Sequence, residues 1–179
     1  STFIDNRFTT ISFRATLSVT TALSAVVTTA YQRSGGYSWI DRMYITAQNG
    51  NIVEDVTEYG LVNDLMVATQ LNPATRDSLA VQYGFLSDPA ATVSQGHQWT
   101  TIATGATTAA VEAYSYSMPL MSSLIGVTAD KFFNIGRTNK LQVAIQTPTE
   151  LPISIINAGA MAAGAFTMTL SDFAIQCNY

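Results

Sequence analysis

Few side chains in this sequence could carry acid–base or metal chemistry. His97 is the only histidine, and its neighbours Gln95, Gly96 and Gln98 are typical of a surface loop. A lone histidine cannot build a multi-histidine metal site. Cys177, the only cysteine, alternates in phase with Phe173 and Ile175, so we expect it to point into a core as a small hydrophobic side chain. These residues therefore predict no metal site and no nucleophile.

The acidic residues Glu54, Asp55 and Glu58 lie close together in a segment with helical spacing. Two carboxylates on one helix face could serve glycoside hydrolysis, but the local sequence offers no partner, and acids commonly begin helices. No serine lies in a G-x-S-x-G or S-x-x-K motif, and Gly35-Gly36 is too short for a phosphate-binding loop. We predict no catalytic, cofactor or metal residues, and a hydrolase ranks third among the functional hypotheses.

A set of aromatic residues supports a different hypothesis, a carbohydrate- or receptor-binding module. Sugar recognition needs exposed planar rings, and five tryptophans and tyrosines could supply them, although packing in a core is the more frequent role of such rings. The five are Trp39, Tyr44, Trp99, Tyr114 and Tyr116. This binding module, which would remain a small soluble oligomer, is the alternative function.

The composition favours one β-rich domain with extensive contacts to neighbours. A chain of 179 residues fits a single domain, here 1–179, and its high content of hydrophobic residues (47%), threonine and serine favours strands. Only 11% of the residues are charged, against about a quarter in typical soluble domains. We therefore expect part of the surface to be buried against other subunits.

Charge and hydropathy also restrict the class of partner. The net charge of −4 and the lack of a lysine–arginine cluster argue against direct nucleic-acid binding. No apolar run approaches the roughly 20 residues that span a bilayer, and no signal-peptide pattern is present. A single cysteine suits assembly in a reducing cytoplasm.

Alternating apolar residues predict seven or eight strands. The clearest pattern runs from Ile11 to Val19, with isoleucine, phenylalanine, alanine, leucine and valine on one face. Further strands are expected over 23–31, 37–47, 114–118, 141–146, 153–156 and 166–177, with a short one near 99–103 in a loop over 87–108. Turn chemistry at 33–36 and 48–51 should end two of them.

Two helices are expected between the third strand and this loop. Apolar residues at three- and four-residue spacings, including Leu61 and Leu65, predict a helix over 53–69, opened by Glu54 and Asp55. A second helix is expected over 73–83, with Asn72 as its cap and Pro73 in its first turn.

These elements predict an all-β antiparallel jelly-roll sandwich with one or two short helices in a long connection. Residues 119–126, P-L-M-S-S-L-I-G, should form a packed corner between two strands, because apolar residues follow a proline and end at a glycine. We expect seven side chains in the core: Ile11, Phe13, Leu17, Val143, Ile145, Phe173 and Ile175.

Three blocks of the sequence carry a resemblance to a known family. They are residues 39–59, with the order Gly50, Glu54-Asp55, Tyr59; the segment 119–136, which continues the corner with K-F-F-N-I-G; and the closing strand 167–176. In this order they resemble the major capsid proteins of tailless icosahedral viruses of the double jelly-roll lineage. This chain has strands for only one roll, so a second roll would either follow in a longer chain or be a separate chain.

The resemblance implies a structural protein of a virion, assembled in the host cytoplasm, rather than an enzyme. Such subunits form trimeric, pseudo-hexagonal building blocks of an icosahedral shell. The expected partners are copies of the chain, neighbouring capsid subunits, the second roll, and minor capsid or membrane-associated virion proteins. Because arginine and tryptophan are favoured at interfaces, the candidate contact residues are Arg14, Arg33, Arg42 and Trp99.

Overall fold

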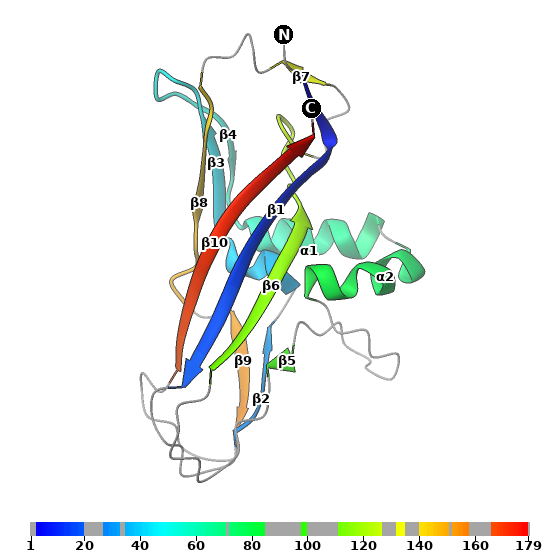
Figure 1. Cartoon of the computed structure of the whole chain (residues 1–179), viewed down its shortest axis with the longest axis vertical. Helices are drawn as coiled ribbons and strands as arrows, with labels where there is room; N and C mark the ends of the chain where they lie inside the picture. Colours follow the sequence, from blue (N-terminus) through cyan, green and yellow to red (C-terminus); the bar gives the residue numbers. More distant parts are fainter. Residues whose placement is uncertain are drawn as a thin grey trace.

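The computed structural model shows a mostly β protein with antiparallel sheets and helices along one side (Figure 1). It describes residues 3–19, 27–32, 35–70, 72–84, 98–99, 111–126, 132–134, 140–150, 152–157 and 166–178. One sheet of long strands forms a layer. Two smaller sheets lie behind it in the view of Figure 1, one toward each end of the molecule.

The long sheet has the order β10-β1-β6, with β1 (Phe3–Val19) between β6 (Val111–Pro119) and β10 (Phe166–Asn178). The alternation predicted from Ile11 onward is confirmed, because Ile11, Phe13 and Leu17 are at most 4% exposed. Phe13 lies directly opposite Tyr116 of β6, and their rings pack with centroids 5.2 Å apart. One face of β1 is therefore a continuous apolar surface.

A bulge in β10 reverses the phase of its apolar residues. Arg14 of β1 pairs with Ser171 and Ser12 pairs with Ala174, so β10 has one residue more than β1 across this interval. Asp172, in this interval, has a φ of 57°, a left-handed conformation that aspartate tolerates better than most residues. The extra residue of this bulge explains why the apolar positions of β10 shift from Met168 and Leu170 to Phe173 and Ile175.

The smaller sheets have the orders β4-β3-β8 and β5-β2-β9. Their strands are β2 (Val27–Gln32), β3 (Arg42–Thr46), β4 (Ile52–Val56), β5 (Gln98–Trp99), β8 (Gln142–Gln146) and β9 (Ile153–Asn157), while β7 (Phe133–Asn134) pairs with the start of β1. The predicted strand 37–47 is too long, because residues 35–39 form the 3-10 helix η1 (Gly35–Trp39). Most of the loop 87–108 lies outside the described residues.

The prediction of a helix over 53–69 is wrong at its start. Residues 52–56 form the edge strand β4, which pairs with β3, and helix α1 runs only over Tyr59–Gln70. The first amides of α1 donate to backbone carbonyls, Tyr59 N to Asp41 O and Gly60 N to Ile40 O. Glu54 and Asp55 therefore do not cap a helix. The second helix is confirmed as α2 (Pro73–Tyr83), with Thr75 N donating to Asn72 Oδ1 at 2.8 Å.

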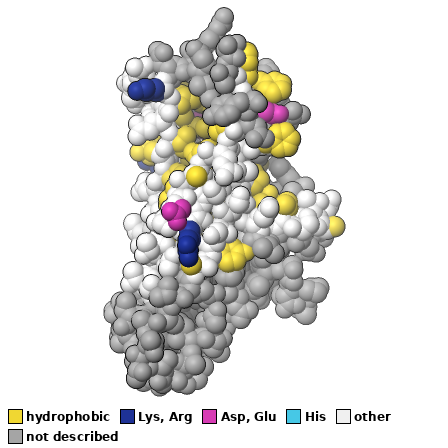
Figure 2. All heavy atoms as spheres, in the orientation of Figure 1, with side chains coloured by type: hydrophobic (Ala, Val, Ile, Leu, Met, Phe, Trp, Pro, Cys, Tyr) yellow, Lys and Arg dark blue, Asp and Glu magenta, His cyan; other side chains and the backbone are white. Residues whose placement is uncertain are grey.

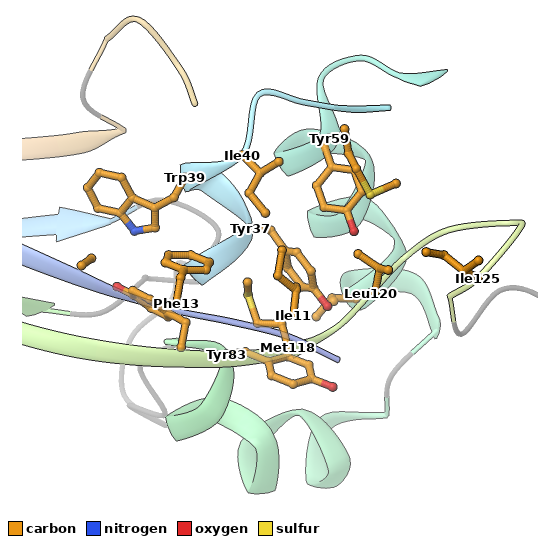
Figure 3. Packing of buried hydrophobic residues seen from close by; sticks show 14 of the residues in the cluster. Ile11, Phe13, Tyr37, Trp39, Ile40, Tyr59, Tyr83, Met118, Leu120 and Ile125 are labelled. Atoms are coloured by element: carbon orange, nitrogen blue, oxygen red, sulfur yellow. The ribbon is translucent and has the colours of Figure 1, made fainter. Parts of the chain in front are cut away.

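The core lies between the long sheet, η1, β3 and the two helices. Figure 3 shows Tyr37 of η1 between Ile40 and Tyr59 on one side and Met118 and Leu120 on the other. Of the predicted core residues, Ile11, Phe13 and Leu17 are buried, and Val143, Ile145 and Ile175 are partly buried against the cluster. Phe173 was predicted to be inside but is 42% exposed, with one face stacked on Phe13 at 5.0 Å.

Candidate functional site

The corner, residues 119–126, is where segments distant in sequence meet. It leaves β6 at Pro119 and folds back through a turn in which Gly126 N donates to Ser122 O. A Cβ on Gly126 would lie 2.0 Å from Leu120 O, so only glycine fits there without a shift of the backbone. Leu120 is fully buried, and its amide donates to Thr9 O of β1. The predicted packed corner is confirmed.

Glu54 of β4 binds the corner through its carboxylate. Its oxygens accept hydrogen bonds from Ser122 Oγ at 2.5 Å, Ser123 N at 2.7 Å and Ser123 Oγ at 2.8 Å. Ser122 Oγ in turn accepts from the amides of Leu124 and Ile125, each at 3.2 Å. One carboxylate thus organises the whole turn, a role that the sequence pattern did not indicate.

Two buried tyrosines join the helices to the same corner. Tyr37 of η1 donates from its hydroxyl to Pro119 O at 3.0 Å, and Tyr59 of α1 accepts at its hydroxyl from Met121 N at 2.9 Å. The rings of Tyr37 and Tyr59 meet edge to face, 6.2 Å apart. Burial raises the pKa of both hydroxyls above the ordinary tyrosine value, so both remain protonated at neutral pH.

The junction buries the serine that lies beside its carboxylate. A serine hydroxyl beside a carboxylate can act as a nucleophile with its base, but Ser122 is only 1% exposed in this arrangement of the corner. The proposed acidic helix face does not form, since Glu54 and Asp55 belong to β4 and Glu58 precedes α1. Over the described part of the chain, no group of three His, Cys, Asp or Glu residues could hold a metal ion.

Of the four candidate contact residues, the structure describes the side chains of Arg14 and Arg42, which lie on different sheets. Arg14 is exposed on β1, opposite Ser115 and Ser171, whereas Arg42 lies on β3. Arg33 lies outside the described residues, as does His97, and of Trp99 only its backbone place in β5 is described. Cys177, predicted to point inward, is half-buried on β10.

Arg42 has a local partner instead. Its guanidinium donates to both carboxylate oxygens of Asp55, from Nε at 2.8 Å and from Nη2 at 2.5 Å, across the β3–β4 pair. It also lies 5.1 Å from the ring centre of Tyr44. Because the pair is open to solvent, we expect it to orient these side chains more than to stabilise the fold.

The Arg42–Asp55 pair makes stability depend on pH. The hydrogen bond from Arg42 lowers the pKa of Asp55 below its ordinary value, so the pair stabilises the fold above the unfolded-state pKa of about 4. That contribution should be lost as the pH falls through the lowered pKa. We expect the Tm difference between the wild type and Asp55→Asn to shrink over this acidic range, and equal Tm differences at neutral and low pH would contradict the assignment.

Large apolar side chains remain exposed over much of the described surface. Figure 2 shows apolar side chains gathered toward the end of the molecule that carries β7 and the β3–β4 hairpin. The outer side of α1 adds Leu61 and Leu65, both 65% exposed, because its buried side is formed by Tyr59, Asn63 and Val67. No described helix is long and apolar enough to cross a bilayer.

Among the pockets of the described surface, two have walls formed by residues from several elements. The larger, of about 470 Å³, lies where the β3–β4 turn meets the corner, β7 and the start of β8. The smaller, of about 330 Å³, is lined by Trp39 and β10 and by Thr147, Pro148, Glu150 and Pro152. Trp39 and Tyr116 are only 2% and 1% exposed, so two of the five aromatic rings considered for sugar binding belong to the core.

A search of protein-family models, curated proteins and solved structures finds none that matches this chain.

Proposed function

We propose that the chain is a structural subunit of an icosahedral virus shell, a jelly-roll major capsid protein that assembles into trimeric, pseudo-hexagonal capsomers. The observation that carries the proposal is the set of large apolar side chains that the described fold leaves on its surface. They are Phe3, Phe8, Ile52, Val53, Leu61, Val62, Leu65, Phe132 and Phe173, each more than 40% exposed. With only 11% charged residues, such a surface is best stabilised by contacts with neighbouring subunits.

The contacts between the resembling blocks support the same proposal. Glu54 and Tyr59, from the first block, bind Ser122, Ser123 and Met121 of the second. The third block is β10, which pairs with β1 beside the strand that leads into the corner. The segments that resemble capsid proteins therefore form one connected structural unit, as parts of a common scaffold would.

The partners proposed for this surface are copies of the chain, neighbouring capsid subunits, a second jelly roll and minor virion proteins. Arg14 fits such a contact, because it is exposed on β1 and arginine is favoured at interfaces. The outer side of α1 fits equally, because Leu61 and Leu65 present an apolar stripe one helical turn apart. The binding-module alternative is weaker, since the burial of Trp39 and Tyr116 reduces the available ring surface.

The proposal predicts that a charge on the α1 stripe blocks assembly without unfolding the subunit. Leu65→Lys places an ammonium group at a 65% exposed position, which a monomer tolerates but a buried contact does not, at a cost of several kcal/mol. Light scattering and particle imaging should show large assemblies for the wild type and small species for Leu65→Lys, with unchanged circular dichroism.

Gln82→Lys provides a matched control, because Gln82 is an exposed polar residue on the neighbouring helix α2. This variant should assemble like the wild type. If the wild-type protein in its native source were instead a stable, dilute monomer with no neighbouring chains, the capsid proposal would fail. Saturable glycan binding by that monomer would favour the binding module.

A further inference from the structure

The pocket of about 470 Å³ has a lining suited to an uncharged ligand. Its wall consists of Leu124 from the corner, Phe133 from β7, Leu141 before β8, and Val53 from β4, with Ala47 at the end of β3. Pockets of roughly 300 to 1,000 Å³ lined in this way hold small organic molecules in other proteins. The size and lining therefore admit a ligand of modest size.

Among the described lining residues, the polar side chains are two amides. Gln48 and Asn49, both exposed, belong to the lining through the β3–β4 turn, so they lie on its solvent side. Asn49 Oδ1 accepts from Asn51 N at 3.2 Å, which leaves its Nδ2 group as a donor. These amides can hydrogen-bond one neutral oxygen, but neither can neutralise a charge.

The charged side chains of the adjoining strand are engaged elsewhere. Glu54 accepts three hydrogen bonds from Ser122 and Ser123, and Asp55 forms its ion pair with Arg42. None of these three ionisable residues belongs to the lining. Against the described lining residues, a charged ligand would thus lose hydration without gaining a counter-charge, which costs far more than placing an apolar chain there.

We propose that this pocket is a binding site for a neutral, mainly apolar small molecule with a single hydroxyl or carbonyl group. The apolar body contacts Leu124, Phe133 and Leu141, and the polar group meets the amides of Gln48 and Asn49 at the solvent side. The inference does not rest on the capsid proposal, although Val53 belongs both to this pocket and to the apolar surface assigned there to subunit contacts.

The experiment compares 1-octanol with octanoate, which differ mainly in charge at one end. Nile red, a neutral fluorophore, reports on the apolar site, and each compound is titrated as a competitor. We expect 1-octanol to displace Nile red saturably and to raise the Tm, because a ligand that binds only the folded chain stabilises it. Octanoate should compete at least about tenfold more weakly, because its charge finds no partner.

Ala47→Phe should fill the pocket and weaken 1-octanol binding at least about tenfold. The control variant is Ala174→Phe, at an exposed position on β10 outside the lining, and it should bind 1-octanol like the wild type. Val53→Phe serves as a second filling variant if Ala47→Phe is not folded by circular dichroism. Equal binding of 1-octanol and octanoate would overturn the proposal, and so would unchanged binding of 1-octanol in the folded filling variant. Binding that weakens as the protein concentration rises would also overturn it, because a neighbouring copy of the chain would then occupy the pocket.

Discussion

Replacing Gly126 with alanine is expected to destabilise the fold by about 3 kcal/mol, because the new methyl group overlaps backbone atoms on two sides. Its Cβ would lie 2.0 Å from Leu120 O and 2.4 Å from Ser122 N. Backbone atoms cannot rotate away as a flexible side chain can, so the turn itself must open. Urea denaturation followed by circular dichroism measures this loss as a lower midpoint.

Gly50→Ala is the matched control for this substitution. Gly50 lies in the β3–β4 turn with a φ of 81°, and a Cβ there would meet no heavy atom within 4 Å. Its replacement costs only the left-handed backbone strain, about 1 kcal/mol. Similar losses for the two variants would show that the corner yields easily, which would contradict its tight packing.

Removing the Glu54 carboxylate should also weaken the junction strongly. Glu54→Ala deletes three hydrogen bonds to a charged acceptor and leaves the hydroxyl of buried Ser122 without this partner. Because Glu54 is only half-buried, we expect a loss of about 2 to 3 kcal/mol rather than the sum of three charged hydrogen bonds. Glu54→Gln should retain part of this stability, since its carbonyl oxygen still accepts from Ser123.

Asp55→Ala controls for the loss of a carboxylate from the same strand. Asp55 interacts with Arg42 in solvent rather than with the corner, so its removal should change the Tm much less than Glu54→Ala does at neutral pH. Thermal unfolding of the two variants in parallel provides the comparison. A Tm loss for Asp55→Ala as large as that for Glu54→Ala would mean that general surface charge, and not the junction, explains the effect.

Local chemistry in the sequence was sufficient to predict several elements. The alternation from Ile11 to Leu17 requires only that one face of a strand is buried, and that face is indeed buried. Asn72 caps α2 because a side-chain oxygen three residues before an amide can accept its hydrogen bond. The turn at 48–51 forms because Gly50 adopts a positive φ, with Gly50 N donating to Ala47 O.

The segment 52–65 shows where periodicity fails. Apolar residues at three- and four-residue spacings fit a helix, yet residues 52–56 pair with β3 and complete a sheet. Two apolar stripes also compete on α1, and the stripe with Leu61 and Leu65 remains outside. The buried side contains Asn63, whose amide donates to Tyr59 O within the helix, and Tyr59, whose hydroxyl accepts from Met121 N. The long-range contact of Tyr59 decided the orientation.

The sequence by itself determined a mostly β chain with antiparallel strands, a packed corner over 119–126 and a surface poor in charge, because each of these depends on composition or on neighbours along the chain. Only the tertiary structure decided what the corner binds. Glu54 and Ser122 are 68 residues apart, and Tyr59 and Met121 are 62 apart. No pattern of spacing encodes which carboxylate will meet which amide, since that depends on how the sheets pack. The apolar pocket beside the corner depends on the same packing, because its lining comes from five separate segments.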